Sequence, residues 1–343
     1  MYIGVVGLNH KTSPVQTREK LFISVDRVRN GLERFRERHP ESECVIISTC
    51  NRTEVYTGSH EGQMDCELLA EFLAEFQDVS RSEFADSLYH FEMEDCVKHL
   101  FCVASSVDSM IVGETQITAQ VKEAYQCALG NRFSGRTLNT LFQRALAVAK
   151  KVRTRTRISE GKVSVSSVAV AFAERIFGEL RGKTVMVVGA GEMADLTLKH
   201  LVSRGASDVI VTNRTYEKAI QLAVEYDGEA VPMERLGETL GKPDIVICST
   251  SAAEHLIGKT VVQRSLKSRA NRPLCFIDIA VPRNVDPEVG SLDNVYLHNI
   301  DHLESVVKDN IEDRQGEIAK SLEIIESEVG RFMKWLERHP ASR

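Results

Sequence analysis

Thr184–Ala194 reads TVMVVGAGEMA, and its pattern says more about the fold than any other stretch of the chain. Thr184–Val188 predicts a buried β-strand, and the G-x-G-x-x-A that follows lies between this strand and a predicted helix. Glycines in this context let the backbone approach a pyrophosphate, which then lies on the N-terminus of the helix. We therefore predict a Rossmann-type, doubly wound α/β domain. The cofactor-binding residues predicted here are Gly189, Ala190, Gly191, Glu192, Met193 and Ala194.

More strands of the same domain are predicted downstream. Apolar runs bounded by polar residues cover 208–212, 244–248 and 274–279, and residues 294–297 indicate a further strand. Such buried runs, separated by helical segments, are typical of a parallel sheet. We expect the sheet to be complete by about residue 300.

The strand at 208–212 ends in Asn213-Arg214-Thr215, and these three residues complete the predicted cofactor site. In an NAD-binding domain an acidic residue stands about here and binds the ribose hydroxyls. This chain has Arg214 instead, and a guanidinium suits a 2′-phosphate. The sequence therefore favours NADPH as the cofactor.

Upstream, residues 44–54 read CVIISTCNRTE, an apolar run that ends abruptly in polar residues. The run predicts a buried strand, so Cys50 lies just past its end, at the rim of a core where a substrate can reach it. Arg52 offers a fixed positive charge that favours a thiolate or holds a carboxylate. Buried cysteines are also common and inert, so a catalytic and a structural thiol both remain open on these residues alone.

The rest of the N-terminal region predicts an α+β domain. Strands are expected at 2–8 and 54–58, and helices at 25–38 and 67–76. From residue 92 to about 156 the pattern is almost entirely helical.

Within that helical region, Ser105–Ile117 is polar and contains a glycine. It is too rich in potential side-chain ligands for a plain connection, although a capped helix start with solvated Glu114 and Gln116 is the alternative. His99 precedes it on a helix, beside the apolar face. A histidine there is either a hydrogen-bonded structural residue or a catalytic one.

One basic tract stands out in a chain whose net charge is −6: residues 132–157 contain no acidic residue. It is either a solvated helix face with a linker or a surface that tracks the phosphates of a nucleic acid. Its basic residues are Arg132, Arg136, Arg144, Lys150, Lys151, Arg153, Arg155 and Arg157.

After about residue 300 the sequence predicts one long helix, with apolar residues at three- and four-residue steps from Leu303 to Leu336. A helix with a continuous apolar stripe must pack on something along its length. We expect its tail to meet a partner beyond the first two domains or to lie exposed.

Composition sets broader limits. A length of 343 residues predicts two domains, and 43% hydrophobic with 27% charged residues is ordinary for a soluble globular protein. The N-terminus lacks a signal-peptide pattern, and no apolar run approaches the roughly 20 residues of a membrane helix. Eight cysteines without C-x-x-C spacing indicate free thiols in a reducing cytoplasm and argue against a zinc site, so no metal is expected.

The chain resembles the glutamyl-tRNA reductase family through six motifs in the family's order. These motifs are Gly7–Thr12, Ser48–Glu54, Gly113–Ile117, Gly189–Ala194, Asn213–Thr215 and Asp278–Arg283. The resemblance implies a catalytic, substrate-binding domain at 1–156, an NADP-binding Rossmann domain at 157–299 and a long connecting helix at 300–343.

The resemblance also implies a reaction, the first step of tetrapyrrole synthesis by the five-carbon route. The Cys50 thiolate attacks the ester of glutamyl-tRNA, tRNA leaves, and hydride from NADPH reduces the thioester to glutamate-1-semialdehyde. His99 would assist near the thiol, and Arg52 would hold a carboxylate of the glutamate. The other substrate-binding residues implied by the family are Thr49, Asn51, Ser109, Glu114, Thr115, Gln116 and Gln120.

Partners and alternatives complete the expectations. Members of this family usually carry a C-terminal dimerisation domain, whereas this sequence stops at Arg343, so the homodimer expected of the family is in question here. Whether the product passes directly to glutamate-1-semialdehyde aminomutase is left open. Two other functions remain: a shikimate-dehydrogenase-like NADP oxidoreductase, which needs no cysteine nucleophile, and a non-catalytic regulator that binds NADPH.

Overall fold

The computed structural model divides the chain into two compact units, Met1–Lys162 with Asp309–Arg343, and Val163–Lys308. No helix in the described part of the chain is both long and apolar enough to cross a membrane. The structure describes residues 1–59, 66–110, 112–114, 116–159, 165–270, 272–303 and 315–339.

The first unit is built on a four-stranded antiparallel sheet in the order β2-β3-β1-β4. Its strands are β1 (Tyr2–Asn9), β2 (Ser42–Ser48), β3 (Arg52–Ser59) and β4 (Tyr89–Glu92). The first three confirm the predicted strands with slightly wider bounds. The edge strand β4 was not predicted, because four residues are too few to show an alternating pattern.

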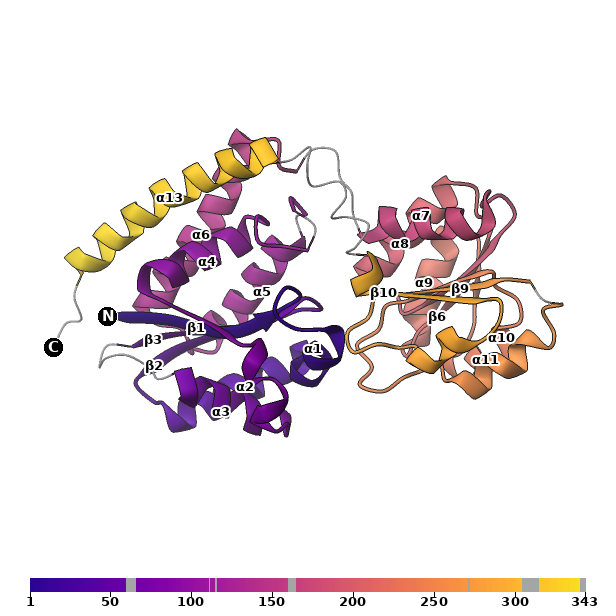
Figure 1. Cartoon of the computed structure of the whole chain (residues 1–343), viewed down its shortest axis with the longest axis horizontal. Helices are drawn as coiled ribbons and strands as arrows, with labels where there is room; N and C mark the ends of the chain where they lie inside the picture. Colours follow the sequence, from indigo (N-terminus) through magenta and orange to yellow (C-terminus); the bar gives the residue numbers. More distant parts are fainter. Residues whose placement is uncertain are drawn as a thin grey trace. The chain divides into compact units, whose positions relative to one another are not determined.

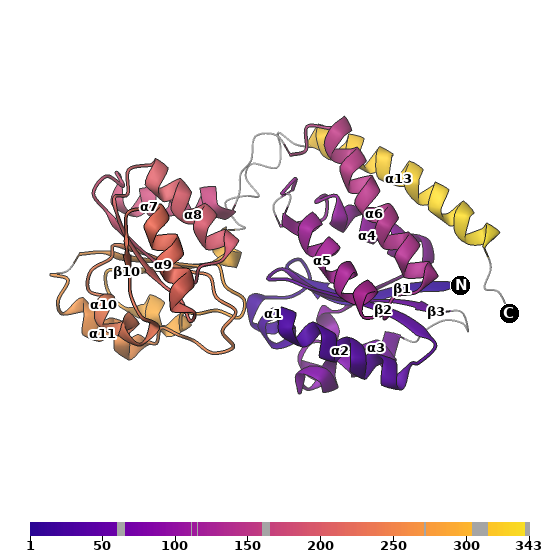
Figure 2. The same ribbon diagram turned by 180° about the vertical axis from the view of Figure 1, so that it is seen from behind.

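Helices cover both faces of this sheet (Figures 1 and 2). On one face lie α1 (Val15–Leu21), α2 (Val25–Arg38) and α3 (Cys66–Gln77). On the other lie α4 (Met93–Ala104), α5 (Gln116–Gly130) and α6 (Arg136–Arg155). Strands β1 and β3 are buried along almost their whole length, so mainly the strand ends and connections can present side chains to a ligand.

The C-terminal helix α13 (Gln315–Arg338) packs against α4 and α6 of the same unit. Ile325, Val329, Phe332 and Leu336 are buried in the common core. The predicted apolar stripe is therefore confirmed for this helix, whereas residues 304–314 of the predicted helix lie outside the described part. The expectation that the tail of this helix meets a partner beyond the first two domains or lies exposed is wrong as far as Leu336, because the first unit buries the stripe up to that residue.

The second unit contains a six-stranded sheet in the order β10-β9-β8-β5-β6-β7, with all strands parallel. The predicted parallel, doubly wound sheet is confirmed, including the further strand near residue 295. Only the two-residue β7 was not predicted. The strands are β5 (Thr184–Val188), β6 (Asp208–Thr212), β7 (Glu229–Ala230), β8 (Ile245–Cys248), β9 (Leu274–Asp278) and β10 (Val295–Asn299).

From β5 the chain moves to the neighbouring strand β6 in one direction along the strand order, and from β8 it moves to β9 in the opposite direction. Because such crossovers are right-handed, their helices lie on opposite faces, as Figures 1 and 2 show for α8 and α11. The strand order thus reverses between β5 and β8, and a ligand crevice is expected outside their carboxyl ends.

The helices of the second unit are α7 (Val165–Phe177), α8 (Glu192–Ser203), α9 (Tyr216–Glu225), α10 (Leu236–Thr239) and α11 (Lys259–Leu266). Short 3-10 helices cover Arg81–Glu83 and Ala85–Ser87 in the first unit, and Met233–Arg235 and Pro287–Ser291 in the second.

Candidate active site

Cys50 lies at the tip of the tight hairpin that joins β2 to β3. The backbone N–H of Thr49 donates to the carbonyl of Arg52 at 2.8 Å, which leaves Cys50 and Asn51 as the tip. The Thr49 hydroxyl accepts from the N–H groups of both Asn51 and Arg52 at 3.2 Å. The thiol is half-buried, at the rim of the core, where the strand pattern predicted it.

A second turn supports this hairpin from the end of β1. The N–H of His10 donates to the carbonyl of Asn51 at 3.0 Å, and Asn9 closes the turn with its side-chain oxygen. Arg18 on α1 donates from Nε to the carbonyl of Cys50 at 3.4 Å. The Gly7–Thr12 motif therefore holds the backbone on which the thiol is mounted.

The surroundings of Cys50 favour its neutral form. Burial raises the pKa of the thiol to about 11, and the nearby Glu114 carboxylate also raises it, whereas Arg18 and Arg52 lower it. Arg52 thus acts on the thiol in the predicted direction, but the sum of the other effects is larger. With such a pKa, roughly one thiol in a thousand is ionised at pH 8.

Arg52 itself is 2% exposed and already has acidic partners. Its Nη1 donates to Oε1 of Glu54 at 2.5 Å, and its Nη2 donates to the carbonyl of Asp108 and lies 3.4 Å from Oδ2 of that residue. If Arg52 is to hold a substrate carboxylate, as predicted, the partly exposed Asp108 must give way to it.

Glu54 is the centre of a buried hydrogen-bond network. It accepts from Arg52, from the hydroxyl of Tyr56 at 2.8 Å, from the hydroxyl of Tyr89, and from Nε2 of His99 at 2.9 Å. Burial alone would raise the pKa of Glu54, but Arg52 and His99 hold it far below its usual value. Glu54 is therefore ionised and can only accept hydrogen bonds.

That constraint fixes one proton on His99. Because Glu54 only accepts, Nε2 of His99 carries a proton, and Nδ1, which lies 3.9 Å from Oδ2 of Asp108, is the other ring nitrogen. Tyr89 and Phe91 contact the ring with centroid distances of 5.2 and 4.9 Å. These contacts bring His99 to Glu54 and Asp108 rather than to the thiol, so its assistance to the thiol stays a prediction.

His99 also lines a pocket of about 580 Å³ in the first unit. The pocket carries both apolar surface and several charged groups. Leu322 of α13 reaches its wall, so the C-terminal helix contributes to it. The remaining lining residues include Asn9, Lys11, Tyr89, Phe91, Lys98 and Asp108.

Two predicted substrate-binding residues carry unsatisfied atoms. Oδ1 of Asn51 and Oγ of Ser109 are buried without a hydrogen-bond partner in the described part of the chain. Leaving a buried polar atom unpaired costs about 1–3 kcal/mol, so such atoms suit a polar ligand. Gln116 begins α5 and Gln120 follows one turn later on the same face, both half-buried. Thr115 lies outside the described residues.

Glu114 is placed by a glycine that no other residue can replace. Gly113 has φ of 89°, and a Cβ there would lie 1.8 Å from the carbonyl oxygen of Ile158. Glu114 is half-buried and acts on the Cys50 thiol, so it is not merely solvated. This loop is therefore more than the start of a helix.

In the second unit, a pocket of about 320 Å³ lies at the carboxyl ends of β5, β6 and β8. Gly189 has φ of 104°, and a Cβ there would lie 2.4 Å from the carbonyl oxygen of Ser249, so this turn requires glycine. The N–H of Ala190 donates to Oδ1 of Asn213 at 3.3 Å, which ties the ends of β5 and β6 together. The predicted residues that line the pocket are Ala190, Gly191, Asn213, Arg214 and Thr215.

Comparison with known proteins decides the family. Residues 6–156 match the model "Glutamyl-tRNAGlu reductase, N-terminal domain", and residues 171–306 match "Shikimate / quinate 5-dehydrogenase". A glutamyl-tRNA reductase of Thermodesulfovibrio yellowstonii is 47% identical, with 98% of this chain and 80% of the relative covered. The chain belongs to the glutamyl-tRNA reductase family.

Other members of the glutamyl-tRNA reductase family agree. The glutamyl-tRNA reductase of Magnetococcus marinus is 43% identical over 98% of this chain and 80% of its own length. The solved glutamyl-tRNA reductase from Methanopyrus kandleri is 37% identical, with a TM-score of 0.53 and coverage of 98% of this chain and 80% of that one. The match to the shikimate and quinate dehydrogenase model covers 171–306, which lies within the second unit.

Not every cofactor residue predicted from the glycine motif lines the pocket. Gly189 shapes the turn, Glu192 is exposed in the first turn of α8, and Ala194 is a buried residue of the same helix. Met193 is half-buried and also lies outside the lining. The prediction missed Lys218, Thr250 and Ser251, which do line the pocket. Lys218 could have been predicted, because it lies four residues after Arg214 near the start of a helix, and residues at this spacing lie on the same face.

The basic tract of this reductase is mostly exposed. Seven of its eight basic residues are exposed. Lys151 is the exception: it is half-buried, and its Nζ lies 2.6 Å from Oε1 of Glu328 on α13. One cation of the tract therefore holds the C-terminal helix, and the role of the others in tRNA binding stays a prediction.

Proposed function

We propose that this protein reduces glutamyl-tRNA to glutamate-1-semialdehyde with NADPH, through a thioester on Cys50. The observation that carries the proposal is the half-buried thiol at the hairpin tip, in a chain aligned over 98% of its length with glutamyl-tRNA reductases. The two further candidates lack such support, because a shikimate dehydrogenase or a regulator needs no nucleophile there.

The chemistry needs a nucleophile and a hydride donor. The Cys50 thiolate adds to the ester carbonyl, the C–O bond to tRNA breaks, and the tRNA hydroxyl takes up a proton. A thioester accepts hydride more readily than a carboxylate does, so covalent capture divides a difficult reduction into two steps. NADPH would supply the hydride when bound, and the Cys50 sulfur would then leave as the thiolate to release the aldehyde.

The raised pKa of Cys50 keeps the thiol mostly neutral, although the reaction needs the thiolate. Glu114 contributes to that raised value, and the substrate carries an α-ammonium group. Glu114 pairs with this ammonium when the substrate binds, which neutralises the charge that opposes the thiolate. The nucleophile is thus activated chiefly when its substrate is present, and a free thiol is protected from side reactions.

The rest of the substrate meets complementary groups. The unpaired oxygens of Asn51 and Ser109 accept hydrogen bonds from the ammonium or other donors of the substrate. Arg52 exchanges Asp108 for the glutamate side-chain carboxylate, while Glu54 keeps the guanidinium in place. Glu54 likewise fixes the tautomer of His99, so the imidazole is oriented before the substrate arrives.

The second unit supports NADPH rather than NADH. Arg214 and Lys218 are both exposed, and both line the pocket at the carboxyl end of β6. Among the described lining residues there is no carboxylate to bind a ribose 2′-hydroxyl. Two cations and no acid at this position suit a 2′-phosphate.

The test is to incubate the protein with glutamyl-tRNA, with and without NADPH, and to measure its mass. Without NADPH one glutamyl group should appear on the Cys50 peptide, and with NADPH it should disappear as semialdehyde forms. Cys50→Ser should abolish both, whereas Cys127→Ser, which removes another half-buried thiol, should change neither. If the Cys50→Ser protein still acquires a glutamyl group, the nucleophile is another residue. If the parent protein forms no semialdehyde, the alternative function as a non-catalytic regulator that binds NADPH is supported.

A further inference from the structure

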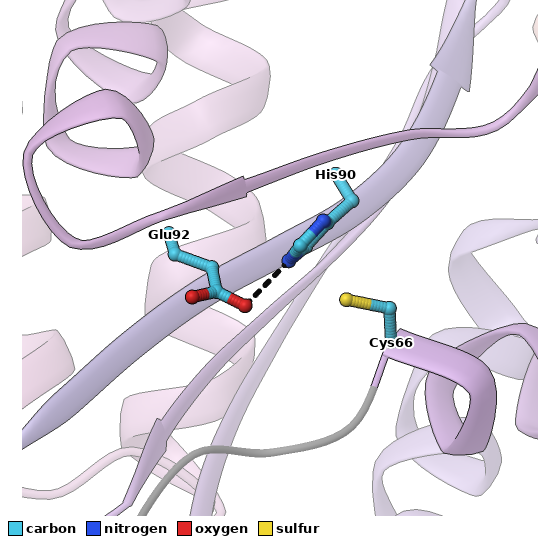
Figure 3. Close-up of side chains that lie close together, drawn as sticks. All are labelled: Cys66, His90 and Glu92. Atoms are coloured by element: carbon cyan, nitrogen blue, oxygen red, sulfur yellow. Dashed lines mark hydrogen bonds and ion pairs between the residues drawn. The ribbon is translucent and has the colours of Figure 1, made fainter.

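Three side chains of metal-binding type meet at the edge of the first unit's sheet (Figure 3). Cys66 is the first residue of α3, and His90 and Glu92 lie on the edge strand β4. One ligand atom from each lies within 4.8 Å of the other two, and Nε2 of His90 lies 2.7 Å from Oε1 of Glu92. The described part of the chain contains no other such group of three.

The two faces of β4 contact different parts of the first unit. Side chains alternate along a strand, so His90 and Glu92 point one way, while Tyr89 and Phe91 point the other way, against His99. The cluster is thus separate from the pocket that His99 lines. It is nevertheless one residue away from Tyr89, whose hydroxyl donates to Glu54.

The donor set selects among metals. A thiolate, an imidazole and a carboxylate are the three ligand types that Zn²⁺ takes from proteins. Mg²⁺ and Ca²⁺ prefer oxygen ligands throughout, so a site with sulfur and nitrogen disfavours them. Ligand atoms on one tetrahedral zinc lie about 3.3–3.6 Å apart. The separations here run from 2.7 Å to at most 4.8 Å, so small side-chain rotations are enough.

The surroundings also suit an ion. The hydroxyl of Tyr2 donates a hydrogen bond to Glu92, and such an outer partner orients a ligating carboxylate. His90 is exposed and Cys66 and Glu92 are half-buried, which gives an ion access from solvent without leaving the ligands unsupported.

We propose that Cys66, His90 and Glu92 bind one Zn²⁺ ion, with a water molecule in the fourth position. The sequence indicated no zinc site because its ligands stand 24 and 2 residues apart along the chain, without the paired spacing of known zinc motifs. The ion ties the start of α3 to the edge strand, and so supports the strand whose other face contacts His99 and Glu54.

The experiment uses the full chain with Cys50→Ser, so that the hairpin thiol does not bind the metal. Zinc is removed with a chelator and then titrated back in competition with a chromophoric chelator. We expect one equivalent to bind, and Co²⁺ in its place to give thiolate-to-cobalt charge-transfer absorption. Tyr2→Phe should weaken binding by about 10- to 100-fold, as loss of an outer partner does.

Ligand variants decide whether these residues are responsible. Adding Cys66→Ser should remove the charge-transfer band and weaken zinc binding by more than Tyr2→Phe does, and His90→Gln should weaken it similarly. Adding Cys127→Ser should leave the affinity and the band unchanged. Circular dichroism establishes that each variant is folded before titration. The proposal is overturned if the Cys50→Ser protein binds no zinc, or if the Cys66→Ser and Cys127→Ser variants bind it equally.

Discussion

Replacing Glu54 by glutamine should destabilise the first unit strongly. The fully buried carboxylate pairs with the equally buried guanidinium of Arg52 at 2.5 Å. Glutamine keeps the size and an acceptor oxygen, but it removes the negative charge. Glu54→Gln therefore tests how much the charge of this network contributes, rather than how well the side chain packs.

The magnitude follows from the contacts. Removing one partner of a buried ion pair costs about 3–5 kcal/mol, because it leaves an uncompensated charge. In the variant, Arg52 still donates to the backbone carbonyl of Asp108, and the side-chain carboxylate of Asp108 lies 3.4 Å away, so the lower end of this range applies. We expect the free energy of unfolding at pH 7 to fall by about 3 kcal/mol.

The same charge predicts a pH dependence. The pKa of Glu54 is lowered in the folded protein, whereas in the unfolded chain it is about 4.3. Its stabilisation is therefore complete above about pH 5 and declines as the pH falls from about 4.3 towards the folded pKa. The parent and Glu54→Gln proteins should differ most at neutral pH and converge in acid.

The single tryptophan makes the measurement specific to the first unit. Trp335 lies on α13 and packs beside Phe332, with a ring-centroid distance of 5.3 Å. Its fluorescence during urea unfolding therefore reports this unit and not the Rossmann unit. The matched control is Glu326→Gln, which breaks an exposed pair with Lys98 and should cost less than about 1 kcal/mol. Equal effects of the two substitutions, or a Glu54→Gln deficit that grows in acid, would refute the reasoning.

Three further predictions concern the cofactor, the thiol and the tRNA. Arg214→Asp should shift kcat/KM from NADPH towards NADH by repelling the 2′-phosphate, and an unchanged ratio would assign that contact to another residue. Glu114→Gln should lower the pKa of Cys50, so iodoacetamide should alkylate the Cys50 peptide faster at pH 8 than in the parent; an equal or slower rate would contradict the charge effect. Lys150→Gln with Arg153→Gln should weaken tRNA binding and flatten its log–log salt dependence by up to about 0.7–0.9 per lost contact. If the affinity for tRNA and its salt dependence stay at the parent values, this surface is only a solvated helix face.

The elements predicted from the sequence are those with long periodic patterns. The strand Thr184–Val188 and the helix Val25–Arg38 have the bounds that their apolar spacing indicated. The missed elements are short: β4 has four residues, β7 has two and α1 has seven. Their conformations depend on neighbours in space, because such lengths carry little periodic signal.

The candidate site shows a different limit. Cys50 could be found because a strand end and a nearby arginine are local features of the sequence. Glu54 could not be assigned a role, because its donors come from positions as distant as Tyr89 and His99. The only indication was a single acid in a strand whose other residues, apart from Arg52, are apolar or carry hydroxyl groups. The three side chains of the proposed zinc site are likewise distant in the sequence, because Cys66 begins α3 whereas His90 and Glu92 lie on β4.

The arrangement of charges around Cys50 has a consequence for activation. Arg52 is the cation that the sequence placed nearest to the thiol, yet Glu54 and Asp108 largely neutralise it. Burial and Glu114 then outweigh the remaining positive charge at the sulfur, and the pKa rises. A substrate ammonium that pairs with Glu114 would offset this negative charge, whereas Arg52 would exchange the carboxylate of Asp108 for that of the substrate and stay paired. Glu114, which would recognise the glutamyl group, would thus also lower the pKa of the Cys50 thiol once it is paired, and this links specificity to reactivity.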